Sequence, residues 1–250
     1  MRDCVIIIPT YNEKENIAKI IPYTLQLSER FDILIVDDGS PDGTADVVRN
    51  LMSEFPNRVH LLERSGKLGL GTAYITGFKW ALEKDYAYIF EMDADFSHPP
   101  EKLLDLLAAC ENDAAYLSVG SRYIKGGGVV NWPFDRLFLS WIASKYVRLI
   151  TGMRIKDTTA GFVCYRRETL QQIDFSKIKF VGYAFQIEMK FAVWLLELKV
   201  IEVPILFKDR EIGTSKMHGG IIKEAVLGVL QMKWQSLKDK YFYTRKKRSI

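Results

Sequence analysis

Short apolar runs that each stop at a polar cluster constrain the fold of this chain more than any other feature. Residues 4–8 (CVIII) and 31–38 (FDILIVDD) are two such runs, and residues 86–92 (YAYIFEM) form a third. Continuous apolar runs are typical of strands buried on both faces of a sheet. Segments with the apolar spacing of amphipathic helices separate them. This alternation predicts a single α/β domain in which helices flank a mostly parallel central sheet, with right-handed connections.

The same alternation continues along the rest of the chain. Asn12 and Glu15 have the spacing of a capping box, which predicts that the first helix begins there. Pro99 and Pro100 predict the start of another helix, because proline is tolerated in the first helical turn. Further strands are expected at residues 59–62, 115–121, 161–165 and 200–206, and a flexible loop at 126–128. Further helices are expected to end near residues 54 and 84, and to span residues 131–152, 184–198 and 220–243.

Polar residues follow three of the predicted strands at the point where each strand ends. They are residues 9–13 (PTYNE), the pair Asp37 and Asp38, and residues 93–95 (Asp-Ala-Asp). Ligands of open α/β sheets bind at the carboxyl ends of the strands. An isolated Asp-x-Asp is more often a polar turn, but three polar clusters at one sheet edge favour a binding site.

The Asp-Ala-Asp sequence predicts a divalent-cation site. In a strand, residues i and i+2 lie on one face, so Asp93 and Asp95 can converge on one ion. Mg²⁺ and Mn²⁺ prefer oxygen ligands, and Mg²⁺ is commonly held by one or two carboxylates together with substrate phosphates. We therefore expect an ion that bridges these carboxylates to a diphosphate. His98, beside two prolines, is interpreted as a turn or cap residue and not as a catalytic base.

Composition narrows the class of protein. The 250 residues are 48% hydrophobic and 26% charged, with a formal net charge of +4, which suits anionic ligands or membrane surfaces. No nucleic-acid motif is recognised, so nucleic acid is not an expected partner. The chain has three cysteines without a disulfide or metal spacing, no signal peptide and no apolar run of membrane-spanning length. We expect a protein of the reducing cytoplasm.

Two segments suggest peripheral contact with a membrane. Residues 131–152 combine Trp and Phe with Arg and Lys, a composition typical of an interfacial helix, although a core-packing helix fits the pattern equally well. Residues 221–250 are expected to form an amphipathic helix and a basic tail that includes Arg245 and Arg248. Each cation near an anionic leaflet contributes about 1 kcal/mol, although the tail could also be solvated. A membrane-bound partner subunit is an alternative route to the membrane.

Seven short sequences occur in an order that identifies a family resemblance. They are PTYNE (9–13), VDDGSPDGT (36–44), RSGKLGLGTA (64–73), EMDADFSHPP (91–100), GSRY (120–123), DTTAGF (157–162) and DREIGTSK (209–216). Together they resemble the inverting glycosyltransferases of family two and, within that family, the polyprenol (dolichol) phosphate mannosyltransferases. The resemblance implies an A-type glycosyltransferase fold, a single Rossmann-like domain over residues 1–220. Its donor half would span residues 1–122 and its acceptor half residues 123–220.

The resemblance also implies an activity and a set of site residues. The activity is transfer of mannose, with inversion, from GDP-mannose to a polyprenyl monophosphate with Mg²⁺ or Mn²⁺, at the cytoplasmic face of the membrane. Nucleotide contacts would come from Pro9, Tyr11, Glu13, Val36 and Asp38, and metal and diphosphate contacts from Asp93, Ala94 and Asp95. Ser97 stands where many relatives have Gln as a further ligand. Phosphate contacts would come from Arg122, Arg210 and Lys216. Gln186 and Glu188, both weaker matches to the family, would contact the sugar or the acceptor.

The implied reaction depends on stabilising negative charge on the leaving diphosphate, and it does not require a general base. A cation on Asp95 would neutralise the leaving diphosphate, with help from Arg210 and Lys216 on a loop that Gly213 lets close. Arg122 is the candidate for the acceptor phosphate, although it could instead pair with a donor phosphate or a local carboxylate. A phosphate monoester is already a dianion near neutral pH, so no general base is assigned. Glucosyl transfer from UDP-glucose, a glycan-extending transferase and a nucleotide-sugar-binding protein are the alternative functions.

Overall fold

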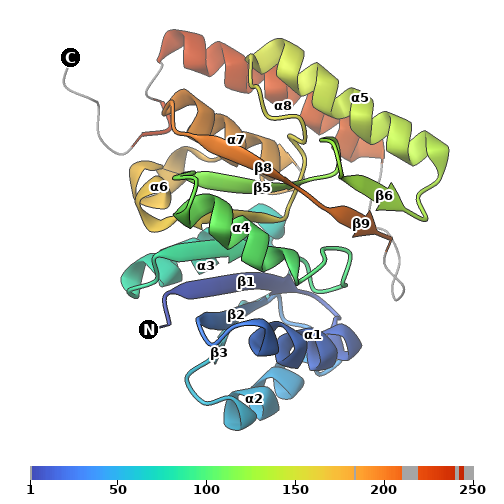
Figure 1. Ribbon diagram of the computed structural model, residues 1–250. Coiled ribbons are helices and arrows are strands. Elements are labelled where there is room, and N and C mark those ends of the chain that lie inside the picture. Colours follow the sequence, from blue (N-terminus) through green and yellow to red (C-terminus); the bar gives the residue numbers. More distant parts are fainter. Residues whose placement is uncertain (1, 183, 210–218, 240–241, 245–250) are drawn as a thin grey trace.

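A seven-stranded sheet forms the centre of the protein in the computed structural model, which describes residues 2–182, 184–209, 219–239 and 242–244. The strand order is β3-β2-β1-β4-β7-β5-β8, and only β7 runs antiparallel to its neighbours. The mostly parallel α/β fold predicted from the sequence is therefore confirmed (Figure 1). The strands are β1 (Cys4–Thr10), β2 (Phe31–Asp37), β3 (Val59–Glu63), β4 (Tyr88–Glu91), β5 (Leu117–Ser121), β7 (Val163–Arg166) and β8 (Val200–Pro204).

Helices cover both faces of this sheet and divide the core in two. In β1, Val5 and Ile7 enter one cluster of buried side chains and Cys4, Ile6 and Ile8 the other, because successive side chains point to opposite faces. The first cluster packs on α3, α5, α6, α7 and α8, and the second on α1, α2 and α4. The helices are α1 (Lys14–Leu27), α2 (Thr44–Glu54), α3 (Leu70–Glu83), α4 (Lys102–Glu111), α5 (Phe134–Thr151), α6 (Arg167–Gln172), α7 (Ala184–Leu195) and α8 (Gly219–Lys238).

Two local predictions are wrong. Asn12 and Glu15 do not form a capping box, because α1 begins at Lys14 with Glu13 at its N-cap and no side-chain cap. Residues 126–128 are not simply a loop: Gly128 begins β6 (Gly128–Val130), which pairs in parallel with β9 (Leu206–Lys208). The run 200–206 is accordingly split between β8 and β9.

Several predicted boundaries are displaced by a few residues. The strand expected at 161–165 begins at Val163, and the helix expected after Pro99 and Pro100 begins at Lys102. The expected helices 184–198 and 220–243 end at Leu195 and Lys238.

The order of the strands places the carboxyl ends of β1 and β4 side by side. Chain connections leave β1 toward β2 on one side, whereas β4 pairs with β1 on the other. This is a switch point, where open α/β sheets bind ligands in the crevice outside the strand ends. The predicted metal residues follow β4 directly and therefore lie at this crevice.

Helices α5 and α8 lie side by side at the far end of the molecule from α2 (Figure 1). Helix α8 also packs on α7, so it is part of the folded body. No helix within the described residues is long and apolar enough to cross a membrane. The division of the chain near residues 122 and 220 stays a prediction.

Candidate active site

The loop after β4 is folded so that the Asp-Ala-Asp carboxylates face one cavity. The backbone N–H of Asp93 donates to His98 Nδ1 at 3.1 Å, and that of Ser97 donates to Asp95 Oδ1 at 3.1 Å. Between them Phe96 adopts a left-handed φ of 58°, which reverses the chain. Asp93, Asp95 and Ser97 all line the cavity, whereas the Ala94 side chain is buried in the core and leaves only its backbone for a ligand.

The buried His98 side chain stabilises the conformation of this loop. Its ring is buried, stacks on Phe162 with centroids 5.0 Å apart, and accepts the Asp93 hydrogen bond. Burial lowers the pKa of His98 to about 4, so the imidazole is neutral at physiological pH. A neutral ring that already accepts a backbone hydrogen bond organises the loop, in agreement with the decision not to assign it as a base.

The residues of this loop fit a hard divalent cation. Asp93 and Asp95 offer carboxylate oxygens, and the buried Ser97 Oγ has no hydrogen-bond partner among the described residues. Buried hydroxyl groups are normally hydrogen-bonded, so this oxygen fits a role as a ligand to a cation. No group of three His, Cys, Asp or Glu side chains that could hold a metal occurs in the described part of the chain. Two carboxylates and a hydroxyl match a cation that takes its remaining ligands from substrate phosphates and water.

The predicted nucleotide residues lie beside this cavity, at the ends of β1 and β2, but do not line it. The Asp38 carboxylate is buried and forms an ion pair of 2.5 Å with Arg64. The Val36 side chain lies in the core, so only its backbone could contact a base. The Lys67 Nζ atom lies 5.1 Å from the centroid of the Tyr11 ring. The Glu13 carboxylate accepts a hydrogen bond from Asn16 at 2.8 Å. Pro9 is half-buried within β1.

Sequence reasoning missed Arg64, whose side chain connects the end of β2 with the glycine-rich segment 64–73. Its guanidinium donates to Asp38 Oδ1 at 2.6 Å and to Thr72 Oγ1 at 2.7 Å. Arg64 opens the sequence RSGKLGLGTA, which was recognised as a unit without a role for its arginine. Asp38 and Arg64 therefore form a buried ion pair at the end of β2, where the predicted nucleotide contacts lie.

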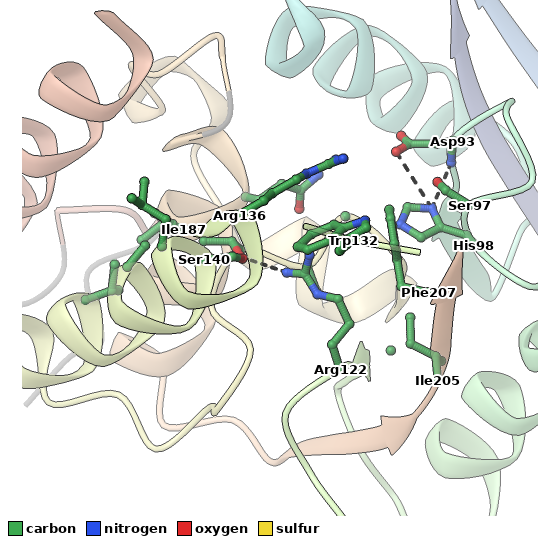
Figure 2. A pocket seen from close by; sticks show the side chains of 18 of the residues that line it. Asp93, Ser97, His98, Arg122, Trp132, Arg136, Ser140, Ile187, Ile205 and Phe207 are labelled. Atoms are coloured by element: carbon green, nitrogen blue, oxygen red, sulfur yellow. Dashed lines mark hydrogen bonds and ion pairs between the residues drawn. The ribbon is translucent and has the colours of Figure 1, made fainter. Parts of the chain in front are cut away.

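The cavity has a charged end and an apolar end. Its volume is about 520 Å³. Figure 2 shows Asp93, Ser97 and His98 on one side, with Arg122, Trp132 and Arg136 facing them. Apolar side chains from α5, α7 and α8 close the other end, among them Leu139, Ile142, Val147, Ile187 and Val226. One continuous space therefore joins the Asp93 and Asp95 carboxylates to an apolar wall.

Arg122 reaches the cavity but is already paired with a local carboxylate. Its guanidinium makes two hydrogen bonds of 2.7 Å to Asp157 and one of 2.8 Å to Thr159. Burial would raise the pKa of Asp157, but the guanidinium outweighs this and the pKa is lowered. Of the alternatives considered for Arg122, pairing with a carboxylate is the one that the structure contains.

A second arginine, Arg136, was missed and lies in the same cavity. Its guanidinium is 4.1 Å from the centroid of the Trp132 ring, and its Nη1 is 3.0 Å from Asp209. The signal was the spacing of Trp132 and Arg136, four residues apart in a segment interpreted as an interfacial or a core-packing helix. Gln186 also lines the cavity, whereas Glu188 does not: it accepts hydrogen bonds from the backbone of Lys179 and Phe180.

Arg210, Lys216 and Gly213 lie outside the described residues, as do Arg245 and Arg248. Their predicted roles in phosphate binding, loop closure and membrane contact stay predictions.

Comparison with known proteins assigns the family. A family model described as "Glycosyl transferase family 2" matches residues 5–174. The chain belongs to glycosyltransferase family 2. Among curated relatives of this family member, polyprenol monophosphomannose synthase from Mycolicibacterium smegmatis is 47% identical over 91% of this chain and 85% of that protein. Undecaprenyl-phosphate mannosyltransferase from Micrococcus luteus is 46% identical over 93% of this chain and 96% of that protein.

More distant comparisons extend this picture of the family 2 fold. Dolichol-phosphate mannosyltransferase from Pyrococcus furiosus is 37% identical over 94% of this chain, which spans 65% of that protein. A mannosyltransferase from Pyrobaculum calidifontis, solved with GDP-Man and Mn²⁺, has a TM-score of 0.60 at 16% identity, covering 95% of this chain and 64% of that one. Glucosyl-3-phosphoglycerate synthase from Mycobacterium tuberculosis has a TM-score of 0.64 at 15% identity, covering 94% and 79%. The A-type glycosyltransferase fold implied by the sequence is therefore confirmed.

Proposed function

We propose that this enzyme transfers mannose from GDP-mannose to a polyprenyl monophosphate, with inversion, and so makes polyprenyl phosphate mannose. The observation that carries the proposal is the cavity in which the Asp93 and Asp95 carboxylates share one space with two arginines and an apolar wall. A sugar acceptor would need a polar groove, whereas an acceptor with a phosphate head and a prenyl tail needs this combination. The names of the relatives in Mycolicibacterium smegmatis and Micrococcus luteus support the same acceptor class and sugar.

On the donor side, the residues of this chain bind and orient the nucleotide sugar. Asp93, Asp95 and Ser97 would hold Mg²⁺ or Mn²⁺, which when bound neutralises charge on the departing diphosphate. The loop of Phe96 and His98 keeps the carboxylates in place, since its hydrogen bonds are made before substrate arrives. Preorganised charges of this kind need no rearrangement during the reaction.

On the acceptor side, Arg136 is the better candidate for the phosphate. The Arg122 guanidinium is tied by Asp157 and Thr159, whereas Arg136 keeps a quarter of its side chain exposed beside the cavity. A phosphate at this position would exchange with Asp209 for the Arg136 guanidinium, which suits the two-pronged recognition of phosphates by arginine. The dianionic phosphate oxygen is itself the nucleophile, so no side chain has to remove a proton.

The outer faces of α5 and α8 would contact the membrane and so place the cavity next to the lipid. Large apolar side chains are exposed there next to cations: Lys145 lies 5.0 Å from the Trp141 ring, and Lys238 lies 5.0 Å from the Trp234 ring. Trp and Lys side by side on an apolar helix face are typical of an interfacial helix. The apolar end of the cavity is formed by the inner faces of the same two helices and α7. This arrangement supports peripheral binding to a membrane surface, which we propose to be the cytoplasmic face.

A transfer assay tests the proposal. Purified protein with Mn²⁺ or Mg²⁺ and a short polyprenyl phosphate is offered labelled GDP-mannose and, separately, labelled UDP-glucose. We expect labelled lipid from GDP-mannose, lost in Asp95→Asn and kept in the matched surface variant Asp105→Asn, whose carboxylate pairs with Lys102 on α4. Product from UDP-glucose alone would refute the mannose donor, and transfer to a glycan but not to the lipid would refute the acceptor.

A further inference from the structure

Two fully buried charges lie under the floor of the cavity, and the mechanism above does not use them. Glu91, at the end of β4, and Lys190, on α7, both have 0% exposure. Removing an ammonium group and a carboxylate from water costs more free energy than packing apolar side chains in the same space. The two groups are connected through a single side chain, that of Gln186, which lines the cavity.

The contacts fix the Gln186 carboxamide at both ends. Its Nε2 donates to Glu91 Oε2, and its Oε1 lies 3.4 Å from Lys190 Nζ. The Lys190 ammonium can only donate hydrogen bonds, so Oε1 has to face it and the amide cannot be turned over. One N–H of Nε2 and one lone pair of Oε1 stay available on the carboxamide.

Lys190 also holds the neighbouring wall of the cavity. Its Nζ donates to the Ala160 carbonyl at 2.5 Å and to the Gln186 carbonyl at 3.1 Å, so all three N–H groups of the ammonium have acceptors. Ala160 and Gly161 line the cavity, and a Cβ on Gly161 would lie 3.6 Å from Gln186 Nε2. The ammonium therefore ties together the two surfaces between which the carboxamide sits.

We infer that Lys190 and Glu91 are positioning residues that hold the Gln186 carboxamide so that it hydrogen-bonds a hydroxyl group of the transferred hexose. The inference rests on the proposed function, because it names the sugar end of the donor as the ligand. A neutral amide that presents one donor and one acceptor matches a hydroxyl, which is also both, whereas the phosphates are matched by the arginines and the cation. A site built to bind a hydroxyl discriminates strongly against sugars that lack it.

A double-mutant cycle on binding tests this role. Dissociation constants for GDP-mannose and for GDP, each with Mn²⁺, are measured by calorimetry for the wild type, Gln186→Ala, Lys190→Met and the double variant. We expect each single change to weaken GDP-mannose about 10-fold, the value of one hydrogen bond, and to leave GDP unchanged. The double variant should bind GDP-mannose no more weakly than the weaker single variant, because both changes remove the same contact.

The controls separate positioning from general structural damage. Lys199→Met removes an exposed lysine that only donates to the Asp113 carbonyl, and should bind both ligands like the wild type. If Lys190→Met does not fold, the pair Glu91→Gln and Lys190→Met, which leaves no buried charge unpaired, replaces it in the cycle. Equal weakening of GDP and GDP-mannose, or effects that multiply in the double variant, would show that Lys190 is structural only.

The result stays readable if the proposed function fails. Coupling between Gln186 and Lys190 for GDP-mannose, in a protein that makes no mannolipid, would refute the acceptor and keep the positioning role. Normal mannolipid synthesis without coupling between Gln186 and Lys190 would keep the proposed function and refute the positioning role.

Discussion

At the end of β2 the Asp38 carboxylate is almost fully buried, and it depends on Arg64, which lies 26 residues later in the chain. Side-chain exposures of 9% and 8% leave little water to solvate either charge. We expect Arg64→Met to lower the free energy of unfolding by about 3 kcal/mol, because the carboxylate is left buried without its partner. Urea denaturation measures this. Adding Asp38→Asn should restore much of the loss, and losses that simply add would contradict a buried pair.

For Ser97 we expect a change in metal affinity and almost none in stability. Its Oγ is buried without a hydrogen-bond partner among the described residues, so Ser97→Ala breaks no contact of the metal-free protein. We expect the free energy of unfolding to change by no more than about 0.5 kcal/mol, while the affinity for Mn²⁺ in the presence of GDP falls. Calorimetric titration of Mn²⁺ checks the second part. Unchanged Mn²⁺ affinity would remove Ser97 from the ligand set.

His98 predicts how stability depends on pH in the metal-free protein. Its pKa is about 4 when folded, against an ordinary value of 6.5, with burial as the main cause. Between these values the unfolded chain binds a proton that the folded protein does not, so the free energy of unfolding falls as the pH is lowered through this window. The full loss is about 3 kcal/mol. Denaturant unfolding across the window should show a shallower slope for His98→Gln, and parallel slopes would contradict the prediction.

At this scale the sequence predicted where the Asp93 and Asp95 carboxylates lie, but not which side chains pair with one another. Asp93 and Asp95 are adjacent in sequence to a strand end, so their place followed from the pattern alone. The pairing of Arg122 with Asp157 joins residues 35 positions apart, and nothing local in the sequence indicates it. The same holds for Glu91 and Lys190, whose burial is unexpected for charged residues.

At the scale of elements, long apolar runs were predicted well and the two three-residue strands were missed. Strands β1 and β2 have seven residues each and are buried except at Pro9, so composition alone identifies them. Strands β6 and β9 have three residues each, too few for a period to be read, and they exist because they pair with each other. Tertiary pairing, rather than propensity, decides such elements.

The outer faces of α5 and α8 carry the prediction that belongs to this scale. Leu149 is 83% and Trp234 60% exposed, so replacing both with Ser should leave the melting temperature almost unchanged. Binding to anionic vesicles should weaken at least about 10-fold, because burying one large apolar side chain contributes about 1.5–3 kcal/mol. Co-sedimentation with vesicles measures it.

Leu104→Ser is the matched control for that face. Leu104 is 41% exposed on α4, which covers the other face of the sheet, and its loss should not alter vesicle binding. Equal weakening by Leu104→Ser would show that the vesicles bind without preference for α5 and α8.

At the scale of the whole molecule, the fold class and the edge of the sheet that holds the candidate site followed from the sequence, but the shape of the cavity did not. Its walls come from the loop after β4, from β9 and from α5, α7 and α8, segments that span most of the chain. Segments far apart in the chain are also joined through Gly71, whose N–H donates to the Val181 carbonyl at 2.8 Å. Periodicity reports which face of each helix is buried but not which helices meet.

Because the donor residues are spread over several elements, donor binding should stabilise the molecule as a whole. A ligand present at 100 times its dissociation constant adds about 2.7 kcal/mol, which for a chain of this size raises the melting temperature by about 5–10 °C. We expect this shift with GDP and Mn²⁺ together and a much smaller one with GDP and a chelator. In Asp95→Asn the two conditions should give the same small shift, since the carboxylate that couples metal to diphosphate is gone. A full shift in Asp95→Asn, or one that survives the chelator in the wild type, would mean that the nucleotide binds without a cation at this carboxylate pair.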